Sequence, residues 1–92
     1  MLITAPFAAS AQKLSNSERD IACSTLGKLT GIVTRFRDEG QTASSAYSLM
    51  IENGLKEKMA LGIVKIVYDD MPNSSPETVA GVSYLGCLEA TK

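Results

Sequence analysis

The stretch SNSERDIACSTLGKLTGIVTRFRDEG, residues 15–40, is the longest periodic segment of the chain. Ser15 and Glu18 fit a capping box at its start, and Gly40 suits the left-handed residue that ends a helix. We therefore predict a helix over 16–39. Its apolar residues alternate at spacings of four and three positions, which places them on one helical face: Ala22, Leu26, Leu29, Val33 and Phe36. The opposite, solvent-facing side is expected to carry Lys28, Thr34, Arg35 and Asp38.

A second row in the same helix consists of very small side chains. Cys23, Gly27 and Gly31 recur every four residues. A glycine inside a helix costs about 1 kcal/mol relative to alanine. Two of them in one helix predict that the backbone of another helix lies close against this row. The alternative is that both glycines are tolerated without any packing role.

Three further helices follow, over 43–52, 55–70 and 76–90. Thr42 and Ser75 are their N-cap candidates, and Pro76 suits a first helical position. The segment 55–70 also contains a β-branched run typical of a strand, but its length and its Glu-Lys-rich start favour a helix. Within it, the spacing of Met59, Ile63, Ile66 and Val67 suits a helix, and in the last helix Val79, Val82, Leu85 and Leu88 are available for the core. Short connections then predict an all-α, compact up-down four-helix domain.

Composition excludes several classes of function. The chain has 92 residues, nine basic and ten acidic side chains, and no histidine. A net charge of −1 without a basic block argues against nucleic-acid binding. No apolar run is long enough for a membrane span. Without histidine the usual general base and imidazole ligand are missing, so we expect no enzyme, no metal site and no cofactor.

The first eleven residues differ from the rest. MLITAPFAASA carries no charge and ends in Ala9-Ser10-Ala11, the small-x-small pattern of a signal-peptidase site. We interpret residues 1–11 as the remnant of a signal peptide and residues 12–92 as a single helical domain, located in the periplasm or secreted. The alternative is an apolar N-terminal arm that packs on the domain.

The number of cysteines is consistent with an exported protein. An even cysteine count in a small exported domain predicts a disulfide, here between Cys23 and Cys87. In an up-down order the first and last helices run in opposite directions, which brings the two cysteines together. Closing the loop over residues 23–87 stabilises the fold by at most about 4 kcal/mol. The alternative is a pair of buried free thiols in a cytosolic protein.

A partner-binding loop is the candidate functional site, formed by Asp69, Asp70, Met71 and Asn73. Acids at a helix C-terminus oppose the helix dipole, so local stability does not account for Asp69 and Asp70. Methionine in an exposed loop suits partner contacts. The alternative is an ordinary connection whose Met71 folds back onto the core. The run from Arg35 to Glu39 is interpreted as a salt-bridged helix end rather than an anion site.

The order of these motifs carries a resemblance. An early cysteine, a helix end R-x-R-D-E-G, the stretch IVKIVYDDMPNSSPETVAGVSYLGC and its closing cysteine resemble small secreted two-cysteine helical proteins of Gram-negative bacteria. In size, disulfide and helicity the chain is also similar to the periplasmic immunity proteins that neutralise type VI secretion amidases. No functional residue of that family can be matched to a position here.

That resemblance implies a small binding protein of immunity or inhibitor type, which covers a site on another protein such as a secreted toxin or effector. The alternative is a periplasmic chaperone-like or structural envelope protein that works through exposed apolar surface. The sequence also allows a homodimer.

Overall fold

The structure is a computed structural model and describes residues 15–92. These residues form α2 (Asn16–Asp38), α3 (Ala43–Glu52), α4 (Glu57–Val64), which continues into a π-helical stretch, η1 (Lys65–Asp70), and α5 (Pro76–Ala90). No strand occurs between residues 15 and 92. The predicted all-α fold with four helices is therefore confirmed. The predicted residues 1–11 of the signal-peptide remnant lie outside the described residues.

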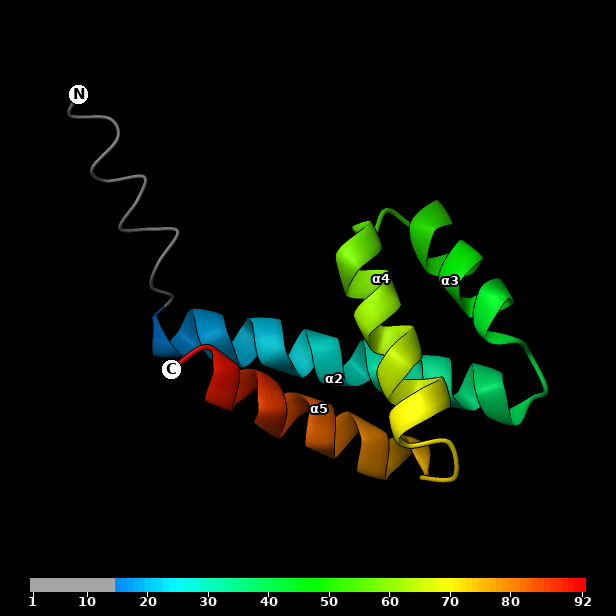
Figure 1. Cartoon of the computed structure of the whole chain (residues 1–92). Coiled ribbons are helices and arrows are strands. Elements are labelled where there is room, and N and C mark those ends of the chain that lie inside the picture. The colour runs from blue at the N-terminus through cyan, green and yellow to red at the C-terminus, as the bar shows by residue number, and fades with distance from the viewer. Residues whose placement is uncertain (1–14) are drawn as a thin grey trace.

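The four helices form two regions (Figure 1). α5 runs back along α2 in the opposite direction, while α3 and α4 lie over the C-terminal half of α2. We call residues 29–80 the head. We call residues 15–28 and 81–92 the arm, because α3 and α4 do not extend over this end of the α2–α5 pair (Figure 1).

The predicted helix ends are confirmed. The Ser15 hydroxyl accepts from the Glu18 amide at 3.1 Å, and the Glu18 carboxylate accepts from the Ser15 amide at 2.9 Å. The Thr42 and Ser75 hydroxyls likewise accept from the Ser45 and Thr78 amides at the starts of α3 and α5, without the second, reciprocal bond. These side chains satisfy amides that have no partner within the helix.

The apolar core lies in the head. It consists of seven buried residues: Val33, Ala46, Met50, Ala60, Ile63, Val67 and Val79. Thr34 was predicted on the solvent-facing side of α2, and this is wrong, because Thr34 is fully buried. Its hydroxyl and that of buried Thr30 donate to carbonyls one turn back in α2, at 2.6 and 2.9 Å. α2 is covered both by α5 and by η1, so its buried arc is wider than its apolar stripe.

Several predicted core residues are exposed. Ala22, Val82 and Leu85 were assigned to the core, and in the structure their side chains face solvent. Leu85 is 64% exposed. All three lie in the arm, and the periodicity could not show that the arm is a pair of helices without a third described helix above it.

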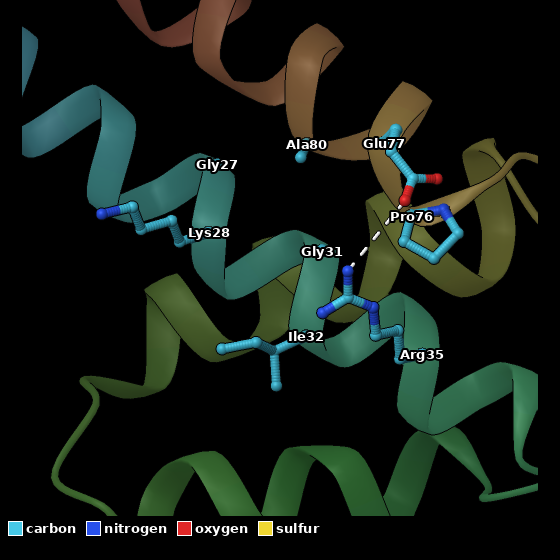
Figure 2. Close-up of a pocket in the computed structure, with 8 residues that line it drawn as sticks. All are labelled: Gly27, Lys28, Gly31, Ile32, Arg35, Pro76, Glu77 and Ala80. Atoms are coloured by element: carbon cyan, nitrogen blue, oxygen red, sulfur yellow. Dashed lines mark ion pairs between the residues drawn. The ribbon is translucent and has the colours of Figure 1, made fainter.

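The α2–α5 contact depends on the row of small residues (Figure 2). A Cβ built on Gly27 would lie 3.0 Å from the carbonyl oxygen of Ala80, and one on Gly31 would lie 3.5 Å from the Ala80 Cβ. One turn earlier, Cys23 and Cys87 form the disulfide, with 5.4 Å between their Cα atoms. Both the close helix approach and the disulfide are therefore confirmed.

Candidate functional site

The loop predicted to bind a partner is divided by the structure. Asp69 and Asn73 are exposed, whereas Met71 is half-buried and packs against the core. Asp70 accepts from the Lys65 ammonium at 2.9 Å, and this hydrogen bond is the main reason that the pKa of Lys65 is raised. Local stability thus accounts for Asp70, which corrects one of the arguments for this loop as a binding site.

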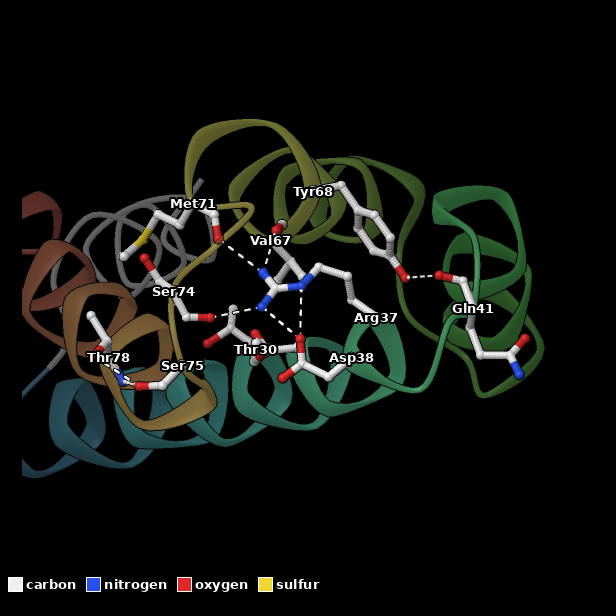
Figure 3. A network of polar contacts seen from close by, with 11 residues as sticks. Thr30, Arg37, Asp38, Gln41, Val67, Tyr68, Met71, Ser74, Ser75 and Thr78 are labelled. Carbon is white, nitrogen blue, oxygen red and sulfur yellow. Dashed lines mark hydrogen bonds and ion pairs between the residues drawn. The ribbon is translucent and has the colours of Figure 1, made fainter.

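Arg37 holds the loop in place (Figure 3). Its guanidinium donates to the carbonyl oxygens of Val67 and Met71, both at 2.9 Å, and to that of Ser74 at 2.7 Å. It also pairs with Asp38 at 2.8 Å. A cation suits this position because the last carbonyls of a helix carry partial negative charge. The guanidinium is fully engaged at a helix end, which agrees with the interpretation of residues 35–39.

Tyr68 fixes the other side of η1 to the α2–α3 connection (Figure 3). Its hydroxyl donates to the carbonyl oxygen of Gln41 at 2.9 Å. Burial raises the pKa of Tyr68, and the charge of Arg37 partly opposes this. At the end of η1 the Met71 amide donates to the Ile66 carbonyl at 2.8 Å, a bond spanning five residues. The wide π turn is thus held by Arg37 and Tyr68 from two directions.

The most extensive candidate surface is an apolar groove between α4–η1 and the arm. Two adjoining hollows, of about 490 and 410 Å³, share Leu26 and Ile66. We define the groove by its apolar and glycine lining: Leu26, Met59, Gly62, Ile63, Ile66, Met71, Val82 and Gly86. Of the predicted site residues, Met71 belongs to this lining and Asp70 borders the same hollow. Asp69 and Asn73 do not.

The floor of the groove contains one polar group. Ser83 lies there beside the disulfide residue Cys87, and only 6% of Ser83 is exposed. Its hydroxyl has no hydrogen-bond partner among the described residues. A buried hydroxyl is normally paired, so this one marks a place where a partner group is missing.

The two ends of the groove differ in charge. Lys56 and Lys58 line one end, and neither ammonium lies within 4.0 Å of a carboxylate between residues 15 and 92. The hollow beyond the opposite end is lined by Arg19, Glu89 and Lys92. There Lys92 pairs with Glu89 at 3.1 Å, and Arg19 donates to the Leu88 carbonyl at 2.7 Å. At these two ends, the cations with neither a carboxylate nor a carbonyl partner are Lys56 and Lys58, at the start of α4.

A separate hollow outside the groove, of about 360 Å³, lies on the other side of the α2–α5 pair (Figure 2). It follows Gly27 and Gly31, whose missing side chains are explained by the approach of α5. Arg35 and Glu77 face each other across it at 4.0 Å. Because packing within the chain accounts for its glycines, this hollow is the weaker candidate for a binding site.

Sequence reasoning missed the groove because its apolar residues follow the spacing of an ordinary helical face. Val82 was assigned to the core, and Met59 gave no sign of exposure. The signal that could have revealed them is a pair of helix glycines, Gly62 and Gly86, which recur on the same faces as these residues.

Chemistry on this surface is limited to apolar contact, charge and one hydroxyl. Between residues 15 and 92 no three histidine, cysteine or acidic side chains are grouped so as to hold a metal ion. None of the described helices is long and apolar enough to cross a membrane.

No protein-family model, curated protein or solved structure matches the chain.

Proposed function

We propose that this chain is a small exported binding protein of immunity or inhibitor type, which covers a site on a partner protein. The observation that carries the proposal is the apolar groove, whose walls expose Met59 and Val82 and whose rim carries the unpaired ammonium groups of Lys56 and Lys58. An apolar centre with a charged rim is the usual composition of a protein–protein interface.

The groove exposes apolar side chains that a partner can bury. Met59 and Val82 in the groove lining are each about half exposed, and burying the remainder contributes roughly 1 kcal/mol per side chain. Their neighbours in the groove are held by the core, by Arg37 and by the disulfide, so little ordering is required when a partner binds. A preformed surface of this kind suits an inhibitor that must bind tightly.

The test compares the survival of two strains of the native host that are grown in contact, one with the gene and one without it. Deleting the gene and growing the deletion strain densely with its parent should reduce survival of the deletion strain by about tenfold or more, and the full-length gene should restore it. The double variant Met59→Asp, Val82→Asp should not restore survival, although both positions are exposed and its melting temperature should stay close to that of the wild type.

Two results would contradict the proposal. In one, the deletion strain survives as well as its parent. In the other, the Met59→Asp, Val82→Asp variant protects as well as the wild type at equal protein level.

A second candidate, a chaperone-like or structural envelope protein, is favoured by apolar side chains outside the groove. Ile21, Ile32 and Leu61 are each more than half exposed, and they lie on α2 and α4 away from the groove lining. Apolar exposure on several faces suits weak binding to many unfolded chains. Suppression of the aggregation of several unrelated denatured proteins by the wild type, equalled by the groove variant, would support this function against the first.

A further inference from the structure

We infer that the occupant of the groove is a helix of a partner protein, with small residues on its contact face and acidic residues at the end that meets Lys56 and Lys58. This inference rests on the proposed function and specifies what the groove recognises. Three independent features carry it: two unexplained glycines, an unpaired buried hydroxyl and an unpaired positive end.

The first feature is the pair Gly62 and Gly86. Both lie inside helices, where glycine lowers stability, and they line the two adjoining hollows of the groove, Gly62 on α4 and Gly86 on α5. A Cβ added to either would meet nothing within 4 Å. Gly27 and Gly31 show what such glycines do elsewhere in this chain, because they admit the backbone of α5. At Gly62 and Gly86 no described segment approaches, so the two positions leave room for the backbone of a bound helix.

The second feature is Ser83, one helical turn from Gly86 on the floor of the groove. Its unpaired hydroxyl is unfavourable in the free protein. Ser83 and Gly86 line the same hollow, so a polar group bound there would lie next to the Ser83 side chain. A hydroxyl or amide on an incoming helix then completes the missing hydrogen bond. This favours an occupant with small polar residues over a purely apolar one.

The third feature is charge. Lys56 is the N-cap residue of α4 and Lys58 lies in its first turn, whose N-terminus has no side-chain cap; Glu57 between them accepts from the Tyr47 hydroxyl. Ammonium groups and the positive end of a helix dipole both attract carboxylates. A second copy of this chain is a poor occupant, because an antiparallel two-fold arrangement brings this lysine end against the hollow lined by Arg19, Glu89 and Lys92, where the carboxylate of Glu89 is already paired with Lys92. Acidic residues on a different protein meet the requirement.

The test uses two synthetic stapled helices of about 16 residues, long enough to follow the groove. Both carry alanine and serine on one face, and they differ in having two Glu or two Lys residues in the first turn. Binding to the full-length, disulfide-bonded protein is measured by fluorescence anisotropy. The acidic peptide should bind at least about tenfold more tightly than the basic one, and added salt should reduce this ratio.

The matched pair of variants is Gly86→Gln and Gly81→Gln. Both glycines lie in α5 with open space at the Cβ, but Gly81 lines the opposite side of the helix, beside Lys28 and Tyr84. Gly86→Gln should weaken binding of the acidic peptide by at least about tenfold, whereas Gly81→Gln should leave it within about twofold. Melting temperatures of both variants establish that each is folded.

Any of three results overturns the inference: no saturable binding of the acidic peptide, equal affinity for the two peptides, or equal effects of the two glutamine variants. If sedimentation shows a dimer that Gly86→Gln dissociates, the occupant is a second copy and the inference is wrong. Failure can be separated from failure of the proposed function in the survival assay. If the Gly86→Gln gene fully protects the deletion strain, the inference that a helix binds in the groove is wrong, while the proposed function is unaffected.

Discussion

The head and the arm are stabilised by different means. The head buries seven apolar residues from α2, α3, α4, η1 and α5 in one cluster. Apart from the disulfide residue Cys23, no apolar residue of the arm is fully buried. Its two helices are held by contact across Gly27, by the disulfide and by polar bonds. The comparison teaches that a pair of helices can be kept ordered while its apolar side chains stay exposed to a partner.

Polar contacts close the free end of the arm. The Arg19 guanidinium donates to the Leu88 carbonyl at 2.7 Å and to the Thr91 hydroxyl at 3.3 Å, so it covers the C-terminal end of α5. The Tyr84 hydroxyl donates to Asp20, and this bond is the main reason that the pKa of Tyr84 is raised. These bonds are partly exposed, so each contributes less than the covalent link beside them.

The largest expected effect is therefore removal of the disulfide. The double variant Cys23→Ser, Cys87→Ser should lower the free energy of unfolding by about 2–4 kcal/mol. Because the core lies in the head, amides of the arm should lose protection from hydrogen exchange first. Native-state exchange followed by mass spectrometry measures this. Equal loss of protection in both regions would show that the arm does not depend on the disulfide more than the head does.

Arg37 is the corresponding test of the head. Arg37→Met keeps much of the side-chain length but removes the donors to three carbonyl oxygens, and the guanidinium side chain is only 12% exposed. We expect a loss of about 2–3 kcal/mol in denaturant unfolding, since these are hydrogen bonds from a charged group.

The control for this variant is Arg35→Met. Arg35 is 66% exposed and its ion pair with Glu77 spans 4.0 Å, so the change should cost less than about 0.5 kcal/mol. Equal destabilisation by the two variants would mean that Arg37 contributes general helix-end charge rather than its specific bonds to the loop.

Much of this comparison could be predicted from the sequence. The capping pairs at Ser15, Thr42 and Ser75 act within one helical turn, so local patterns located the helix starts. Gly27 and Gly31 predicted a neighbouring backbone because their cost is local even though their partner is distant. These features depend on residues close together in sequence.

What could not be predicted depends on which helical faces are covered. Thr34 is buried because both η1 and α5 pack against α2, and Leu85 is exposed because none of the described helices covers its side of α5. Apolar periodicity gives the same signal for a face that meets the core and for a face that meets a partner. The groove was missed for this reason. Arg37 was recognised as part of a helix end, but its bonds to residues 67, 71 and 74 required the fold.

Two glycine substitutions test the comparison further, and they should change the free energy of unfolding by smaller amounts of opposite sign. Gly27→Ala places a methyl group 3.0 Å from a backbone oxygen of α5, and the strain should outweigh the gain in helix propensity by about 1 kcal/mol. Gly86→Ala meets no atom within 4 Å and should stabilise the protein by about 0.5–1 kcal/mol. Thermal and denaturant unfolding of both variants provide the measurement. Destabilisation by Gly86→Ala would show that the free protein already uses the open space above Gly86.

The smallest expected effect is the loss of stability in the first turn of α2 when acid protonates Glu18. The pKa of Glu18 is lowered from its ordinary value of 4.5, first by the hydrogen bond from the Ser15 amide and then by that from the Ser15 side chain. A lowered pKa means that the folded state favours the ionised carboxylate. Its contribution is therefore present above pH 4.5 and is lost as the pH falls through the lower, folded-state pKa.

Glu18→Gln isolates this titration, because glutamine can keep the capping hydrogen bond without a charge. Amide exchange in the first turn of α2 should be slower in the wild type than in Glu18→Gln at about pH 7, and the difference should shrink as the pH falls through the lowered pKa of Glu18. Amides of the head serve as the internal reference, since Glu18 lies at the far end of α2 from the core. A difference that persists unchanged in acid would mean that the shape of the glutamate, and not its charge, stabilises the beginning of the arm.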